Sequence, residues 1–327
     1  MLKPRMVIEY SLLVLGIVFL IFGAKLIIDG SSSLAKKFNI STLVIGLTIV
    51  AFGTSLPELV VNVFAALEGS SGVALGNIIG SNIANILLVL GLVVVITPVK
   101  VKYSTTWKEI PFSFLAIFVL FLLSNYFFFK KSGSFFMTRA SGVILLLFFA
   151  AFMYYVVRST MKHKAQPKNK ELEIPKHNNF TITLMIILGL VGLYYGGQWV
   201  VGGAVFIAKQ FGLSEFLISA TVIAIGTSLP ELVTGVTAAL KHDLDLAVGN
   251  SIGSNIFNVL WILGITALIA PVLIPKFINF DMIFLMGITA LLFLFMFIGK
   301  KRELGRFKGI TMIILYISYL VIISTRG

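Results

Sequence analysis

The sequence predicts an all-α integral membrane protein with ten transmembrane helices, arranged as two inverted five-helix repeats. Three observations lead to this fold class. Of the 327 residues, 58% are hydrophobic and only 12% are charged, whereas soluble domains carry about 25% charged residues. Apolar stretches long enough to cross a hydrocarbon core of about 30 Å recur along the chain. The second half of the chain also repeats the first half at a constant offset in residue number.

The expected spans follow the apolar stretches in chain order. They are residues 7–30, 42–67, 72–97, 110–129, 139–157, 180–206, 215–240, 245–270, 279–299 and 307–324. The first stretch follows Lys3 and Arg5, as the apolar part of a signal peptide would. No small-residue cleavage pattern follows it, however, and the same segment recurs as an ordinary span in the second half. It is therefore expected to be a span.

The stretch between the fifth and sixth spans is the one clear linker. Residues 158–179 contain several lysines, two glutamates and two prolines, and they show no apolar period. The linker divides the chain into a first repeat at residues 1–157 and a second repeat at residues 180–327.

Matching residues relate the two halves without a gap. An offset of 173 residues aligns Thr54 with Thr227 and Glu58 with Glu231. The identities include Pro, Glu, Asn and Thr, so low complexity cannot produce them. Five spans per half is an odd number, so the second half must enter the membrane from the opposite side. The repeats are therefore expected to be inverted, with a shared site near the membrane midplane, as in many secondary transporters.

The basic residues predict how the chain is oriented. The formal net charge is +13, and most of the 26 lysines and arginines fall in the loops after the odd-numbered spans. Cytoplasmic loops of membrane proteins carry such an excess, which explains the positive charge without a nucleic-acid partner. We expect a multi-pass protein of the cell membrane, with both termini outside and the linker at 158–179 in the cytoplasm.

Glu58 and Glu231 differ from the other acidic residues because only these two, of 13, fall in the middle of an expected span. A charged side chain at the centre of a membrane helix costs about 3 kcal/mol on insertion scales. No Lys or Arg is placed at a depth that would neutralise them, and the nearest candidate, Lys25, is expected to snorkel towards an interface. Two unpaired buried carboxylates therefore indicate a cation site.

Oxygen donors precede each glutamate. In the first copy, AFGTSLPE, Thr54 and Ser55 stand four and three positions before Glu58, so all three share a helix face. Pro57 has no N–H to donate to the preceding turn. The span is therefore expected to be broken, with freed carbonyls facing a cavity. The second copy, AIGTSLPE, ends at Glu231 and repeats the arrangement.

The next span in each half adds hydroxyl and amide oxygens. It contains GNIIGSNIAN, which ends at Asn85, and GNSIGSNIFN, which ends at Asn258. Ser81 and Asn85 are four positions apart and face one way, and Ser254 and Asn258 do the same. The remaining asparagines of these two segments can bond either to an ion or to the backbone.

The donor set favours a hard cation. It offers carboxylates, hydroxyls, amides and backbone carbonyls, whereas the chain has no cysteine and its three histidines fall in polar loops. Ca²⁺ takes six to eight oxygen ligands in flexible geometry, and two carboxylates match its charge. Mg²⁺ fits less well because it resists dehydration. Zn²⁺ and Cu⁺ would need imidazole or sulfur ligands.

With its two copies of GTSLPE and of GNxxGSN, the sequence resembles the cation/calcium exchanger (CaCA) superfamily, specifically a prokaryotic sodium/calcium antiporter. The resemblance implies that Glu58 and Glu231 are the central Ca²⁺ ligands, for which Na⁺ competes. It implies that threonine carbonyls also bind Ca²⁺, that alanine carbonyls and serines line the Na⁺ sites, and that two asparagines complete the centre. These implied metal ligands are Thr54, Thr227, Ala51, Ala224, Ser55, Ser228, Ser81, Ser254, Asn85 and Asn258.

Asn85 and Asn258 are where the sequence departs from many exchangers of this type, which often carry Asp at one of the two positions. The centre then holds two carboxylates, which balance one Ca²⁺ or two Na⁺. A third Na⁺ would leave the site net positive unless carbonyl dipoles offset the charge. The number of Na⁺ ions per Ca²⁺, and the acceptance of Li⁺ or K⁺, therefore stay open.

We expect a secondary active antiporter that exchanges Na⁺ for Ca²⁺ by alternating access at a midplane site with two glutamates. Ca²⁺ and Na⁺ are then transiently bound substrates, and neither a resident cofactor nor enzymatic activity is expected. A monomer is expected to suffice, with the glycine-rich first and sixth spans moving against the core. Two alternatives stay open: a Ca²⁺/H⁺ antiporter, in which the glutamates take protons instead of Na⁺, and a cation channel.

Overall fold

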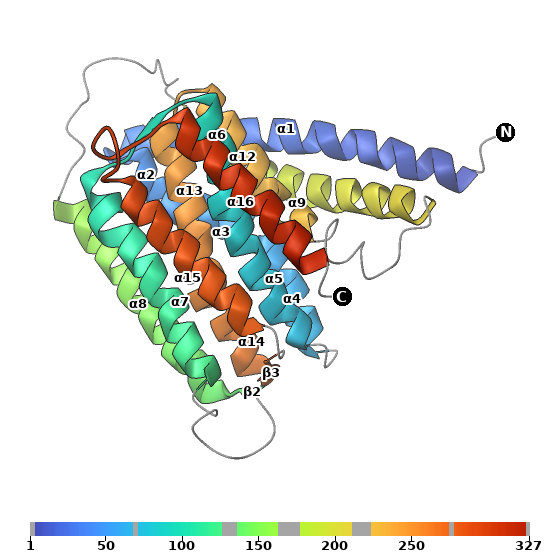
Figure 1. Ribbon diagram of the computed structural model, residues 1–327. Helices are drawn as coiled ribbons and strands as arrows, with labels where there is room; N and C mark the ends of the chain where they lie inside the picture. The colour runs from blue at the N-terminus through green and yellow to red at the C-terminus, as the bar shows by residue number, and fades with distance from the viewer. Residues whose placement is uncertain are drawn as a thin grey trace.

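The chain folds into a bundle of helices, shown in Figure 1 in a computed structural model. The structure describes residues 4–67, 71–125, 136–162, 177–210, 224–274 and 278–324. In the first half the elements are α1 (Pro4–Phe38), α2 (Thr42–Ile45), η1 (Gly46–Val50), α3 (Ala51–Thr54), α4 (Leu56–Leu67), α5 (Ser71–Ala84), η2 (Asn85–Val89), α6 (Leu90–Ile96), β1 (Val99–Lys100), η3 (Thr105–Glu109), α7 (Ile110–Asn125), β2 (Phe136–Met137) and α8 (Arg139–Lys162), where η denotes a π-helical segment. In the second half they are α9 (Asn179–Gln210), α11 (Ala224–Thr227), α12 (Leu229–Leu240), α13 (Leu244–Ile256), η6 (Phe257–Ile262), α14 (Leu263–Ile269), β3 (Val272–Leu273), α15 (Ile278–Phe295), β4 (Glu303–Leu304) and α16 (Arg306–Ser324).

Eight helices among the described residues are long and apolar enough to cross a membrane. A ninth candidate is a broken span, in which Thr42–Thr54 and Leu56–Leu67 meet at an angle of 44°. The expected span at 215–240 begins outside the described residues, and its described part consists of the short helix α11 and the apolar, 12-residue helix α12. The all-helical membrane class is therefore confirmed, whereas the full number of ten spans stays a prediction.

The first expected span was placed too short at its C-terminal end. Helix α1 continues past residue 30 to Phe38 and ends before Asn39, which has a φ of 56°. Sequence reading treats its polar segment as a loop, but Ser32 is buried and donates a hydrogen bond to Asp243 Oδ2 at 2.9 Å. Thr42 donates to Asp243 Oδ1 at 2.7 Å. A buried partner therefore keeps the polar end of this helix inside the fold.

Asp243 joins three elements at this end of the bundle. Besides the two hydroxyls from α1 and α2, it accepts the backbone N–H of Leu246 at 3.3 Å and so caps the N-terminus of α13. Burial raises the pKa of the Asp243 carboxyl, and the hydroxyls of Ser32 and Thr42 oppose that shift.

Helices α1 and α9 lie side by side and extend together away from the rest of the bundle (Figure 1). Their backbones are in close contact at glycines. A Cβ added at Gly23 would lie 2.8 Å from the backbone nitrogen of Leu193, and one added at Gly189 would lie 2.8 Å from that of Ile27. Small residues of this kind let membrane helices approach closely. The two helices therefore form a tightly packed pair.

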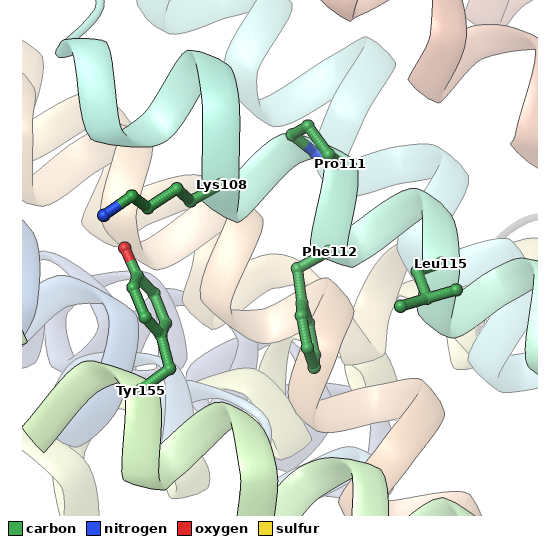
Figure 2. A pocket seen from close by; sticks show the side chains of 5 residues that line it. All are labelled: Lys108, Pro111, Phe112, Leu115 and Tyr155. Atoms are coloured by element: carbon green, nitrogen blue, oxygen red, sulfur yellow. The ribbon is translucent and has the colours of Figure 1, made fainter. Parts of the chain in front are cut away.

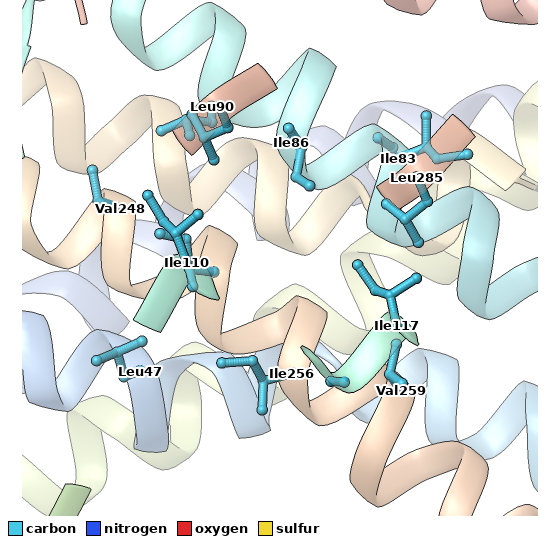
Figure 3. Packing of buried hydrophobic residues seen from close by; sticks show 14 of the residues in the cluster. Leu47, Ile83, Ile86, Leu90, Ile110, Ile117, Val248, Ile256, Val259 and Leu285 are labelled. Carbon is cyan, nitrogen blue, oxygen red and sulfur yellow. The ribbon is translucent and has the colours of Figure 1, made fainter. Parts of the chain in front are cut away.

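Helix α13 forms the centre of the bundle, and every residue from Leu246 to Ile256 is buried. It packs against α2, η1 and α12. Figure 3 shows Val248 and Ile256 of α13 among buried aliphatic side chains from η1, α5, α7 and α15. A Cβ added at Gly249 would lie 2.6 Å from the carbonyl oxygen of Leu43. The central crossing of α13 over α2 and η1 therefore depends on backbone contact.

Two short antiparallel strand pairs connect loops between the helices. Strand β1 pairs with β4, and Val99 faces Leu304. Strand β2 pairs with β3, and Met137 faces Val272. Strand β1 follows α6 and β3 follows α14, and Figure 1 shows these two helices ending at opposite ends of the bundle.

We predict that Gly249→Ala lowers the midpoint of thermal unfolding, because the added methyl group meets a backbone carbonyl that cannot move aside. Overpacking of a filled core costs about 1–3 kcal/mol. Gly287→Ala on α15 is the matched control, because Gly287 is exposed and no described atom lies within 4 Å of an added Cβ. Thermal unfolding of the purified variants, followed by intrinsic fluorescence, tests the difference. Equal midpoints would show that the central crossing tolerates the methyl group.

Candidate cation-binding site

Both intramembrane glutamates follow a break in their helix. Ser55 separates α3 from α4 and has φ −86° and ψ 8°. Ser228 separates α11 from α12 with almost the same angles, φ −86° and ψ 6°. Pro57 and Pro230 are the second residues of the new helices, where a missing N–H costs no helical hydrogen bond. The break expected from the proline in the first copy is present, and the second copy repeats it.

Glu58 and Glu231 lie in the first turns of α4 and α12, and neither side chain is exposed. The free N–H groups and the dipole at a helix N-terminus stabilise a negative charge there. None of the ion pairs among the described residues involves either glutamate. Nowhere among the described residues do three or more His, Cys, Asp or Glu side chains come together as a group that could hold a metal ion. A cation at this place would therefore rely on hydroxyl, amide and carbonyl oxygens beside the two carboxylates.

Each glutamate accepts a hydrogen bond from a serine. Ser55 of the first half donates to Glu231 Oε1 of the second half at 3.1 Å. Ser81 donates to Glu58 Oε1 at 3.3 Å, and its hydroxyl lies 3.4 Å from the hydroxyl of Thr227. Side chains from both halves of the chain thus surround the two carboxylates.

The two threonines of the repeated motif make matching contacts across the halves. Thr54 donates to Asn250 Oδ1 at 3.1 Å, and Thr227 donates to Asn77 Oδ1 at 3.3 Å. The hydroxyl of Thr54 also lies 3.4 Å from that of Ser254. Asn77 and Asn250 therefore bond to side chains of the opposite half, which sequence reasoning had left undecided.

Several buried polar oxygens have no hydrogen-bond partner among the described residues. They include Oε2 of Glu58 and of Glu231, Oγ of Ser228, and Oδ1 of Asn85 and of Asn258. Asn85 begins η2, which packs against α12, and Asn258 lies in η6, which packs against α4. An unpaired buried polar atom costs about 1–3 kcal/mol. This set of acceptors is of the kind that a desolvated cation can satisfy.

The π-helical segments are a feature that sequence reasoning missed. Segment η1 directly precedes Ala51, η2 starts at Asn85, and η6 contains Asn258. A π-helical turn locally shifts the phase of a helix and occurs often at functional sites. No residue pattern in the chain marks these turns, because they depend on how the helices pack.

Asn82 and Asn255, which directly follow Ser81 and Ser254 in the chain, join the two halves. Asn82 Nδ2 donates to the backbone carbonyl of Asn255 at 3.1 Å, and Asn255 Nδ2 donates to the carbonyl of Asn82 at 3.2 Å. Asn258 Nδ2 donates to Asn82 Oδ1 at 3.0 Å. Of the two roles that the sequence left open for this pair, the structure shows backbone bonding. The sequence contains one signal for this pairing: Asn82 and Asn255 occupy equivalent positions in the two repeats.

The predicted site residues are buried, except that the side chain of Ala224 lies outside the described residues and only its backbone, at the start of α11, is described. The carbonyl of Ala51 accepts the N–H of Ser55 at 3.1 Å. The structure does not give Ser228 a bond to Glu58, although the repeat would pair them as it pairs Ser55 with Glu231. The site is therefore asymmetric in detail.

Comparisons with known proteins agree with the resemblance seen in the sequence. The family model described as "Sodium/calcium exchanger protein" matches residues 8–158 and 181–325. The putative antiporter CaxA of Alkalimonas amylolytica is 38% identical over 317 residues, which are 96% of this chain and 98% of that protein. The sodium/calcium exchanger MaX1 of Methanosarcina acetivorans is 34% identical, with 97% and 98% covered. A solved structure of the sodium-calcium exchanger NCX_Mj matches with a TM-score of 0.80 and 31% identity, covering 97% of this chain and 99% of that one.

We predict that Asn82→Ala lowers the thermal unfolding midpoint more than Asn255→Ala does. The Asn82 side chain takes part in two hydrogen bonds, through Nδ2 and Oδ1, whereas only Nδ2 of Asn255 is bonded. Each bond contributes about 0.5–1.5 kcal/mol. Thermal unfolding of both variants under identical conditions measures the order. An equal loss, or a larger loss for Asn255→Ala, would contradict the bonding pattern.

Proposed function

The chain belongs to the sodium/calcium exchanger protein family, and on that premise we propose that it exchanges Na⁺ for Ca²⁺ across a membrane by alternating access. The transported ions bind between Glu58 and Glu231. The observation that carries this proposal is the pair of fully buried carboxylates on opposite halves, each bonded by a serine and without an ion-pair partner among the described residues.

The oxygen donors around the glutamates support Ca²⁺ as one substrate. Two carboxylates supply the charge, and the remaining ligands come from hydroxyl, amide and carbonyl oxygens, which Ca²⁺ accepts in variable geometry. Oε2 of each glutamate, Oδ1 of Asn85 and of Asn258, and Oγ of Ser228 offer acceptors that no described group satisfies. Thr54 and Thr227 contribute carbonyls at the helix breaks.

Charge balance makes the two ions compete. Two carboxylates neutralise one Ca²⁺ or two Na⁺, so both ions cannot occupy the centre together without excess positive charge. The Na⁺ subsites are formed by Ser55, Ser81, Ser228 and Ser254, with the carbonyls of Ala51 and Ala224. Because Asn stands at both 85 and 258, the protein brings no third carboxylate to the centre. If a third Na⁺ is exchanged, the cycle moves one charge, worth about 2.3 kcal/mol per 100 mV.

Inverted repeats supply the two-fold arrangement that alternating access needs. The reciprocal bonds of Asn82 and Asn255 connect two residues that are 173 positions apart. The bond from Thr54 to Asn250 and the bond from Thr227 to Asn77 correspond to each other under the same offset. Strands β1 and β3 are related by the same offset and follow helices that end at opposite ends of the bundle. We assign ten spans in two halves, 1–157 and 180–327, joined by a cytoplasmic linker at 158–179, with both termini outside.

The moving part in this proposal is the pair formed by α1 and α9. The pair is held together by close backbone contacts at glycines and extends away from the bundle, so it can move as a unit. Its sliding would expose the glutamate site to one side and then to the other. One chain contains both halves of the site, so a monomer suffices, and the cycle makes and breaks no covalent bond.

We predict that Glu58→Gln and Glu231→Gln each reduce Ca²⁺ flux to the background of empty liposomes, because each removes one of the two charges that bind the ion. Glu303→Gln is the matched control, since Glu303 lies in β4 and pairs with the exposed Lys300. The measurement is ⁴⁵Ca²⁺ uptake into proteoliposomes, with thermal unfolding to verify the fold. Substantial flux in either site variant would contradict the shared role of the glutamates.

We predict that an outward Na⁺ gradient drives ⁴⁵Ca²⁺ uptake into proteoliposomes and that a pH gradient alone does not. The serines that bond the glutamates supply hydroxyl ligands for Na⁺, which a site that only exchanges protons does not need. Li⁺ and K⁺ gradients tested separately define the ion selectivity. Uptake that follows pH and ignores Na⁺ would identify a Ca²⁺/H⁺ antiporter, and flux that needs no counter-ion would identify a channel.

A further inference from the structure

A groove between α7 and α8 lies outside the glutamate site. It has a volume of about 300 Å³ and is lined by Lys108, Pro111, Phe112, Leu115 and Tyr155. Figure 2 shows the first four side chains on η3 and the start of α7, with Tyr155 facing them from α8. Lys108 and Leu115 are seven positions apart, so the groove follows about 10 Å of helix.

The two ends of the groove differ in chemistry. At one end the Lys108 ammonium lies 5.4 Å from the centroid of the Tyr155 ring. At the other end Phe112 and Leu115 present only apolar atoms, and Leu115 is 40% exposed. A groove with a cationic end and an open apolar end matches a molecule with an anionic head and a hydrocarbon tail.

Exposed aromatic side chains show where the cationic end lies relative to a membrane. Tyr103 and Tyr154 are 63% exposed, and Trp107 is 47% exposed. Exposed Trp and Tyr gather at the headgroup level of a bilayer. Lys108 directly follows Trp107, and Tyr155 directly follows Tyr154. The cationic end therefore lies at the headgroup level, and Phe112 and Leu115 lie deeper in the hydrocarbon.

Lys108 forms no ion pair with a described residue, and its charge acts on the neighbouring Glu109 carboxylate only through space. The adjacent Glu109 is buried, and the Tyr155 hydroxyl donates a hydrogen bond to its Oε1. The exposed Arg158 lies near the same end of α8, with its guanidinium 5.9 Å from the Tyr154 ring. At the headgroup end of the groove, the cations Lys108 and Arg158 are therefore exposed on the surface, whereas the carboxylate of Glu109 is buried.

We propose that this groove binds an anionic glycerophospholipid of the surrounding leaflet. Its phosphate headgroup lies at Lys108, and one acyl chain lies along Phe112 and Leu115. A lysine near a membrane surface contributes about 1 kcal/mol of attraction to anionic lipid, equivalent to about a fivefold preference. The glutamate site plays no part in this binding, so the proposal stands independently of the ions that are exchanged.

Native mass spectrometry of the full-length protein in detergent tests the proposal. The protein is titrated with phosphatidylglycerol and with phosphatidylcholine of the same acyl chains. We expect one phosphatidylglycerol to be retained with an affinity at least about fivefold above that of phosphatidylcholine. Lys108→Gln should remove most of this preference, and Lys301→Gln, an equally conservative change at an exposed site outside the groove, should keep it.

A second variant addresses the apolar end of the groove. Leu115→Trp fills the channel at an exposed position, so it should weaken retention of both lipids while leaving the thermal unfolding midpoint near that of the parent protein. Three results would overturn the proposal: equal retention of both lipids by the parent protein, equal losses in Lys108→Gln and Lys301→Gln, or displacement of the lipid by glycerol 3-phosphate at the same concentration as by intact phosphatidylglycerol.

Discussion

Two carboxylates buried in an apolar helix bundle are the constraint on which the rest of the structure depends. Glu58 and Glu231 have no exposed surface and no Lys or Arg partner among the described ion pairs. Each is instead placed in the first turn of a new helix, where free N–H groups and the helix dipole favour negative charge.

The two halves of the chain contribute to this region jointly. Ser55 of one half bonds to Glu231 of the other, and Asn82 and Asn255 bond reciprocally across the halves. The pairing is nevertheless incomplete, because Ser228 has no hydrogen-bond partner among the described residues. If the halves exchange roles during transport, a single conformation must break their symmetry. Ser55 and Ser228 are where the described structure breaks it.

The sequence was sufficient to predict those features that depend on a local residue pattern or on the internal repeat. Apolar length identified the membrane class, Pro57 located the helix break, and two isolated acids in apolar segments identified buried carboxylates. It was insufficient where a contact joins distant segments. The end of α1 was placed too early because Asp243, its buried partner, lies 211 residues from Ser32. The π-helical segments at Asn85 and Asn258 depend in the same way on neighbouring helices and leave no local pattern.

A single site shared by two ions is tested most directly by equilibrium binding. Isothermal titration calorimetry of the purified protein with Ca²⁺, repeated at increasing Na⁺ with ionic strength held constant by choline, measures the competition. Binding at one site between Glu58 and Glu231 predicts one Ca²⁺ per chain and an apparent dissociation constant that rises steadily with Na⁺. A Ca²⁺ affinity that Na⁺ leaves unchanged would show that the two ions do not share the site.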